Sequence, residues 1–99
     1  MITMVVRIRV LPGTEQRFEA IFAARRKRCL DTEAGTLSYD LYREPAEPRS
    51  YAVIESYASP EALQAHIAGS TDHREMMACF DGKPVAHSLE LCNAVAPQG

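Results

Sequence analysis

His66 is the side chain in this sequence best suited to acid–base chemistry. It falls on the apolar stripe of a predicted helix, together with Leu63 and Ile67, so its imidazole should face the interior. Imidazole has an unperturbed pKa of ~6.5, which suits it to proton transfer near neutral pH. Two interpretations remain open. His66 is either a base or hydrogen-bonding group in a small-molecule pocket, or a core histidine whose ring nitrogens are satisfied by backbone carbonyls or a tyrosine.

Glu55 is the second candidate, because it lies between apolar residues on a predicted strand. If its side of the strand faces the helices, the carboxylate lies in an apolar cavity and its pKa should be raised. If that side faces a partner chain, Glu55 instead forms a salt bridge between subunits, with Arg7 or Arg9. The strand pattern favours neither alternative.

A pocket around these two groups would take its walls from nearby tyrosines and from the predicted helices. Tyrosine is also a good strand former, so cross-strand packing is the competing interpretation for each tyrosine. The residues predicted to line the pocket are Tyr39, Tyr51, Tyr57, Leu63, His73, Met77 and Phe80.

Motifs for metals and bound cofactors are missing from the sequence. His66 and His73 would align only along an unbroken helix, and Gly69 interrupts it. There is no HExxH pattern, no Gly-rich phosphate loop and no CxxC pair among the three cysteines. We therefore expect neither a metal nor a cofactor. The basic residues 25–28 point around most of a helix, so they cannot form one binding patch, and we expect them to be solvated.

Composition indicates an ordinary globular protein. The chain has 99 residues, 46% hydrophobic and 24% charged, with a net charge of −2. This favours one domain over residues 1–96 followed by a tail at 97–99. The charge argues against nucleic acid as a partner, and no apolar run is long enough for a membrane span. With no signal-peptide pattern and no disulfide framework, we expect a cytoplasmic protein.

The predicted elements alternate in a recognisable order. Strands are expected at 2–10, 36–43, 50–57 and 85–95, and the first helix runs from a cap at Thr14 to Gly35. Ser59-Pro60-Glu61 starts a second helix, which Gly69 divides in two. This β-α-β-β-α-β order predicts a ferredoxin-like α+β fold, with a four-stranded antiparallel sheet and helices on one face. The other face carries apolar side chains, so we expect a homodimer packed sheet to sheet.

Three segments carry a resemblance to a known family: VRIRVLPGTEQRFEAIF, EAGTLSYDLYREPAEPRSYAVIESY and SPEALQAHIAGSTDH. In this order they resemble the antibiotic biosynthesis monooxygenase family of dimeric α/β barrels. The resemblance implies a pocket between sheet and helices in each chain, and it carries the family's helix histidine onto His66 and its strand glutamate onto Glu55. Tyr57 departs from the tryptophan that members often carry, and the segment between His66 and His73 is about two residues longer. The haem-degrading branch fits worst, because its histidine ligand falls at Met76 and its tryptophan at His66.

The function expected from the resemblance is a cofactor-independent monooxygenase that oxidises a small quinol or polyphenol with molecular oxygen. His66 would remove a phenol proton, and the anion would pass an electron to oxygen. Two alternatives remain: an isomerase that shuttles protons in a small carbonyl compound, and a non-catalytic small-molecule-binding dimer. Fold alone does not choose among them.

Overall fold

A computed structural model describes residues 1–92 of the chain. Its elements are β1 (Ile2–Arg9), α1 (Glu15–Thr32), β2 (Thr36–Glu44), β3 (Glu47–Tyr57), α2 (Pro60–Ala68), α3 (His73–Met77) and β4 (Val85–Leu89). The predicted order, with its second helix divided in two, is confirmed. The last strand was expected to reach residue 95 but ends at Leu89. The predicted tail at 97–99 lies outside the described residues.

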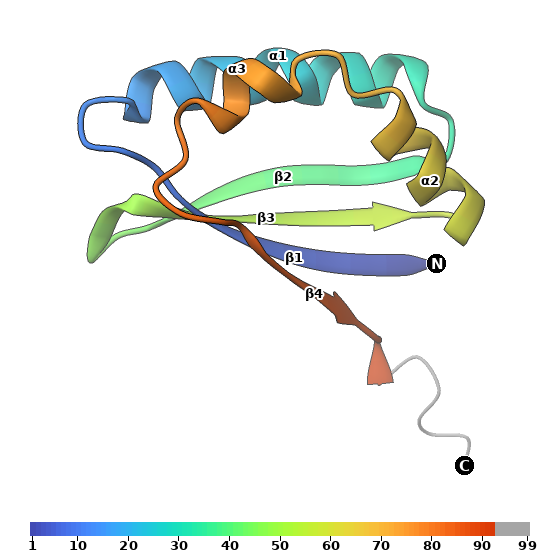
Figure 1. Cartoon of the computed structure of the whole chain (residues 1–99). Coiled ribbons are helices and arrows are strands. Elements are labelled where there is room, and N and C mark those ends of the chain that lie inside the picture. The colour runs from blue at the N-terminus through green and yellow to red at the C-terminus, as the bar shows by residue number, and fades with distance from the viewer. Residues whose placement is uncertain (93–99) are drawn as a thin grey trace.

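The four strands form one antiparallel sheet in the order β2-β3-β1-β4. All three helices cover the same face of it, as Figure 1 shows. Val6 lies opposite Val53 and Ile8 opposite Tyr51, so the alternating apolar residues of β1 and β3 meet on the helix-covered face. The ferredoxin-like α+β arrangement predicted from the sequence is therefore confirmed.

Local sequence signals account for both ends of α2. The Ser59 hydroxyl accepts a hydrogen bond from the Ala62 amide, and Pro60 occupies the first turn of α2. Gly69 then ends α2. Thr14 occupies the N-cap position of α1 as predicted, but its hydroxyl donates to the Leu11 carbonyl at 2.7 Å and makes no capping bond to the helix.

The packed core lies at one end of the space between helices and sheet. Its centre is aromatic: the Phe18 and Tyr51 rings are 4.9 Å apart, and Phe22 stacks on Tyr39 at 4.8 Å. Val10 and Cys79 close this end of the core. Leu37 is two residues before the buried Tyr39, but a register irregularity between Thr36 and Ser38 leaves it 51% exposed.

The face of the sheet opposite the helices is bare and partly apolar. We call it the open face and define it by Val5, Tyr42, Ile54, Val85 and Leu89. Val5 and Ile54 are paired across β1 and β3, and the other three side chains are about half exposed. The whole of β4 is exposed although it pairs with β1. This surface is where the predicted homodimer would form.

Candidate functional site

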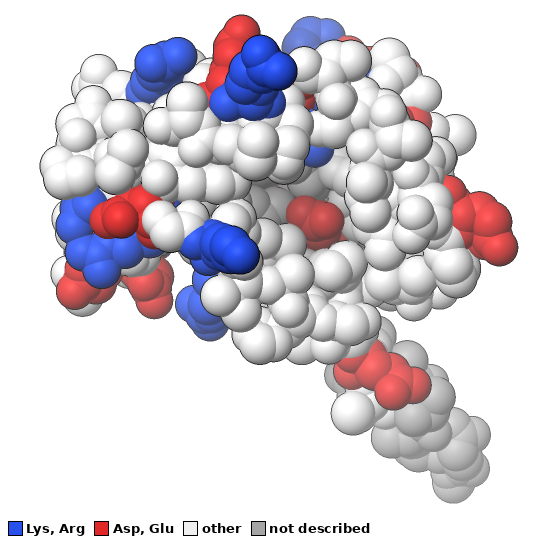
Figure 2. Space-filling view, in the orientation of Figure 1, with Lys and Arg blue, Asp and Glu red and all other residues white. Residues whose placement is uncertain are grey.

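A cavity of about 420 Å³ lies between the sheet and the helices and borders the packed core, with which it shares Phe22 and Tyr39. Figure 2 shows the molecular surface hollowed between these layers, with an acidic side chain inside the hollow. Most of its wall is apolar, with Met4, Val6, Ile8 and Val53 from the sheet and Leu63 and Met76 from the helices. Its polar side chains are Arg25, Tyr39, Glu55, His66, Ser70 and His73. A largely apolar cavity with a few polar groups is typical of small-molecule sites.

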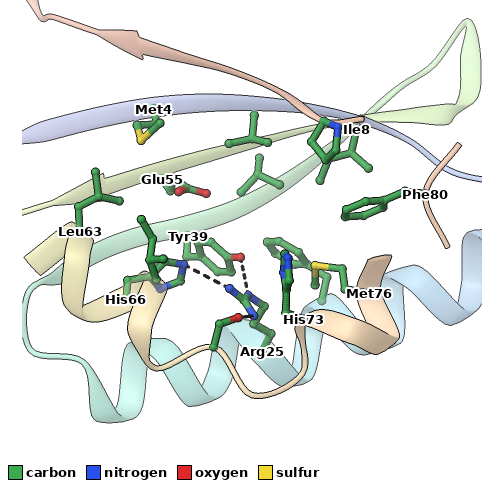
Figure 3. A pocket seen from close by; sticks show the side chains of 16 residues that line it. Met4, Ile8, Arg25, Tyr39, Glu55, Leu63, His66, His73, Met76 and Phe80 are labelled. Atoms are coloured by element: carbon green, nitrogen blue, oxygen red, sulfur yellow. Dashed lines mark hydrogen bonds between the residues drawn. The ribbon is translucent and has the colours of Figure 1, made fainter. Parts of the chain in front are cut away.

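His66 lies in the cavity wall and is 5% exposed. Its Nδ1 is 2.8 Å from Glu33 Oε1, and its Nε2 is 3.5 Å from the Arg25 NH2 nitrogen (Figure 3). Guanidinium only donates hydrogen bonds, so Nε2 must face Arg25 with its lone pair. The neutral ring therefore carries its proton on Nδ1 and donates it to Glu33, a tautomer inferred from these partners.

Arg25 reaches the cavity from α1 and is 6% exposed. Its Nε donates to Tyr39 Oη at 2.8 Å, and its NH1 nitrogen donates to Ser70 and to Asp72. The prediction that the whole basic run is solvated is wrong at this position, although Arg26 and Lys27 do lie at the surface. Buried guanidinium is tolerated here because these neighbours accept its hydrogen bonds.

The signal for a buried Arg25 was present in the sequence. Phe18, Phe22, Arg25 and Cys29 follow helical spacing, and all four are buried in the structure. For Arg25, the position on the apolar stripe of α1 predicts burial better than the neighbouring charged residues predict exposure.

Glu55 faces the helices and is 8% exposed in the cavity wall. Burial raises the pKa of its carboxyl group, although the Tyr57 hydrogen bond and the nearby His66 and Arg25 oppose the shift. Tyr57 Oη donates to Glu55 Oε1 at 2.8 Å. This geometry excludes the alternative of an ion pair with a partner chain.

The two arginines considered for that ion pair have partners of their own within the chain. Arg7 lies 3.8 Å from Glu44, and Arg9 lies 3.6 Å from Asp81.

Three residues predicted to line the pocket do not line it. Tyr51 belongs to the aromatic core, where its hydroxyl donates to Glu19 at 2.6 Å. Tyr57 is fully buried behind the cavity wall, with its ring 5.2 Å from that of His66. Met77 is 47% exposed, and its neighbour Met76 faces the cavity instead. Only Met77 reflects a misplaced helical phase, by one residue, whereas Tyr51 and Tyr57 lie on the expected face of β3 but not at the cavity.

The other predicted lining residues do meet at the cavity: Tyr39, Leu63, His73 and Phe80. Burial raises the pKa of Tyr39 to about 12, against the opposing effect of the Arg25 charge. The Tyr39 hydroxyl is therefore neutral at physiological pH and serves as a hydrogen-bonding partner of Arg25.

Besides Arg25, the sequence analysis missed two residues that contact His66, Glu33 and Cys29. Glu33 Oε1 accepts hydrogen bonds from Thr36 and His66, and these hold the pKa of Glu33 below its usual value although partial burial acts to raise it. Cys29 Sγ lies 3.7 Å from His66 Nδ1. Glu33 stands two residues before Gly35, at a helix end, and nothing in its surroundings along the chain indicates a partner 33 residues away.

Cys29, Glu33 and His66 also place three possible metal ligands within 4.8 Å of one another. The charges around them oppose a divalent cation, because Arg28 lies 3.5 Å from Glu33 and Arg25 lies beside His66. Burial also raises the pKa of the Cys29 thiol to about 11, which disfavours the thiolate that a metal requires. The donor set fits a hydrogen-bonded cluster that orients His66 better than it fits a metal centre.

The chain is therefore a small α+β protein with a ferredoxin-like sheet and a buried histidine in the wall of an internal cavity. Residues 1–78 match the family model described as antibiotic biosynthesis monooxygenase, and the chain belongs to that family. No significant relative was found among curated proteins.

Solved structures support the same assignment. A Caulobacter crescentus protein that carries the family's name is 31% identical, with a TM-score of 0.82 over 91% of this chain and 88% of its own. A further antibiotic biosynthesis monooxygenase structure has a TM-score of 0.83 at 16% identity, covering 92% and 98% of the two chains. A Bordetella bronchiseptica protein with the family's name has a TM-score of 0.76 at 24% identity, covering 91% and 95%. The last two show the fold alone.

Within residues 1–92, the helices are too short or too polar to cross a lipid bilayer.

Proposed function

We propose that this protein is a cofactor-independent monooxygenase acting on a small quinol or polyphenol. The observation that carries the proposal is His66 in the wall of a mostly apolar cavity, with Glu33 on its Nδ1. A neutral imidazole held in this way has its Nε2 lone pair on the side of Arg25 and the cavity. Such a nitrogen is suited to accept a proton from a phenol.

The reaction begins when the phenol oxygen gives its proton to His66. The resulting electron-rich anion passes one electron to dioxygen, and the two radicals combine into a carbon–oxygen bond. His66 returns its proton to the peroxide anion formed in this way. The hydroperoxide then loses water, made from its terminal O–H and the hydrogen on the same carbon, and a carbonyl group remains. One oxygen atom enters the substrate and the other leaves as water, so the substrate supplies all the electrons. The apolar wall limits access of water to the reactive species.

Glu55 is the second proposed catalytic group. Because burial raises its pKa, its carboxyl group is more easily protonated than an exposed one and can donate a hydrogen bond to a second substrate oxygen. The proposal also includes a homodimer through the open face and a cytoplasmic location. The exposed apolar side chains of the open face support the homodimer.

The test is oxygen uptake by the purified protein with a panel of quinols. We expect His66→Ala to lower kcat/KM by about 10²- to 10⁴-fold, the usual contribution of a general base. Gln64→Ala is the matched control, because Gln64 is exposed on the same helix and lies outside the cavity. Oxygen uptake by His66→Ala at the wild-type rate would remove His66 from the mechanism.

An isomerase is the second candidate function. One observation favours it: two groups that can carry protons, His66 and Glu55, line the same cavity. Such a pair can move a proton between two carbons beside a carbonyl group. Turnover of a small diketone without oxygen would favour the isomerase, and strict dependence on oxygen would favour the monooxygenase.

A further inference from the structure

The guanidinium of Arg25 is held firmly on one side and loosely on the other. Nε donates to Tyr39, and NH1 donates to Ser70 and Asp72, which uses three of the five N–H groups. Among the described residues, the NH2 nitrogen has one hydrogen-bonding partner, His66 Nε2, at 3.5 Å. That separation is longer than an ordinary hydrogen bond, which spans about 2.7–3.2 Å. The described contacts therefore leave NH2 with donor capacity next to the cavity.

A single oxygen atom can lie at ordinary hydrogen-bond distance from both nitrogens at this gap. We propose that Arg25 NH2 and His66 Nε2 together form a subsite for one hydroxyl oxygen of a phenol or enol. The hydroxyl donates its hydrogen to Nε2 and accepts a hydrogen bond from NH2. Figure 3 shows the two side chains converging from α1 and α2, beside Tyr39.

The surrounding charges support an oxygen that becomes an anion. When the O–H bond breaks and the Nε2–H bond forms, the imidazolium faces Glu33 and the oxyanion faces Arg25. Asp72 remains on the far side of the guanidinium, at NH1. After the proton transfer, the imidazolium and the oxyanion each face a group of opposite charge. The step is a proton transfer alone, so it needs no oxidant. A donor fixed in advance by Tyr39, Ser70 and Asp72 requires little reorganisation as the charge develops.

The same arrangement indicates which ligands the subsite disfavours. A phosphate group carries two charges and several acceptor oxygens, whereas Arg25 offers one loosely held nitrogen. The carboxylates of Asp72 and Glu33 are close by and would repel further negative charge. The remaining wall is apolar and suits an aromatic ring. The ligand class is therefore an uncharged aromatic or enolic molecule that loses one proton on binding.

A chromogenic pair of probes tests this subsite without any oxidation. 4-Nitrophenol absorbs visible light as its anion, and 4-nitroanisole is the methyl ether that cannot ionise. We expect the wild-type protein to bind 4-nitrophenol about 10- to 100-fold more tightly, the usual effect of a hydrogen bond to a charged group. The bound phenol should show the absorption of its anion. Equal affinity for the two probes would overturn the inference.

Arg25→Met tests the role of the guanidinium directly, since it keeps an apolar stem of similar length. We expect it to lose most of the preference for the phenol and to keep the affinity for the ether. If the variant does not fold, Ser70→Ala is used, because it removes one anchor of the guanidinium and should reduce the preference several-fold. A folded variant of either kind that keeps the full preference would refute the subsite.

The inference deepens the proposed function and rests on it for the fate of the bound phenol. The two fail separately. Phenol-selective binding without oxygen uptake from quinols leaves the subsite and removes the monooxygenase. Oxygen uptake without phenol-selective binding leaves the enzyme and removes the subsite.

Discussion

Gly35, just before β2, lies against Ala62 of α2, and replacing it with alanine should displace that helix. A Cβ atom at position 35 would lie 2.4 Å from the Ala62 Cβ. Carbon atoms pack at about 3.5–4.0 Å, so α2 would have to move by about 1 Å. The backbone of Gly35 is not in the positive-φ region, so this contact is the main cost of the substitution.

The size of the effect follows from packing. Forcing an extra methyl group into a close contact costs about 1–3 kcal/mol, against a gain of about 0.4–1 kcal/mol from restricting the unfolded chain. For a domain of this size each kcal/mol lost lowers Tm by about 4–8 °C. His66 lies one turn after Ala62 on α2, so a shift of this helix should also reduce any activity that depends on His66. Thermal unfolding at a fixed protein concentration measures the first effect.

A second substitution supplies the control. Ala62→Gly alone should cost about 1 kcal/mol through helix propensity. In the double variant the new Cβ meets the Cα at position 62 at 3.4 Å, an ordinary contact. The double variant should therefore be more stable than the sum of the two single changes indicates. Strict additivity, or a Gly35→Ala protein as stable as the wild type, would refute the steric explanation.

The remaining predictions concern Glu55, Glu33 and the open face. The pKa of Glu55 is raised on folding, so its contribution to stability falls as pH rises from its ordinary value through its raised value, and Glu55→Gln should gain stability relative to the wild type across that range. The pKa of Glu33 is lowered, so Glu33→Gln should lose stability at neutral pH, and the difference should disappear as the pH falls through the lowered value. Urea unfolding at a series of pH values tests both, and equal pH dependence in the two variants would contradict the assignment. Ile54→Lys places a charge at the centre of the open face and should produce a monomer in sedimentation experiments; a dimeric variant would exclude this face as the interface.

Most of the fold was predictable from local patterns. Alternating apolar residues in β1 and β3, the Ser59-Pro60-Glu61 helix start and the break at Gly69 each depend on residues close together in the chain. The end of the last strand and the outward turn of Leu37 were not predictable in this way. The register irregularity at Leu37 arises from pairing between β2 and β3, which the β2 sequence alone does not specify.

The candidate site was predictable in part. His66 and Glu55 were found because each places a polar group within an apolar pattern, and such a group needs a partner. The sequence did not settle whether Glu55 faces the helices or a partner chain. Alternation along a strand defines two faces of a sheet without indicating which one the helices cover. Tyr51 and Tyr57 share the strand phase of Glu55, yet neither borders the cavity. Tyr51 packs in the aromatic core and Tyr57 lies behind the cavity wall, and strand alternation does not distinguish these positions from the cavity.

The sequence by itself determined the order of the elements, their apolar faces and the inward position of His66. Only the tertiary structure decided which groups meet the imidazole: Glu33 on one nitrogen and Arg25 on the other. These partners come from the end and the middle of α1, 33 and 41 residues away along the chain. Periodicity reports which side of an element is buried, whereas hydrogen bonds between distant polar groups depend on how the elements are packed in three dimensions.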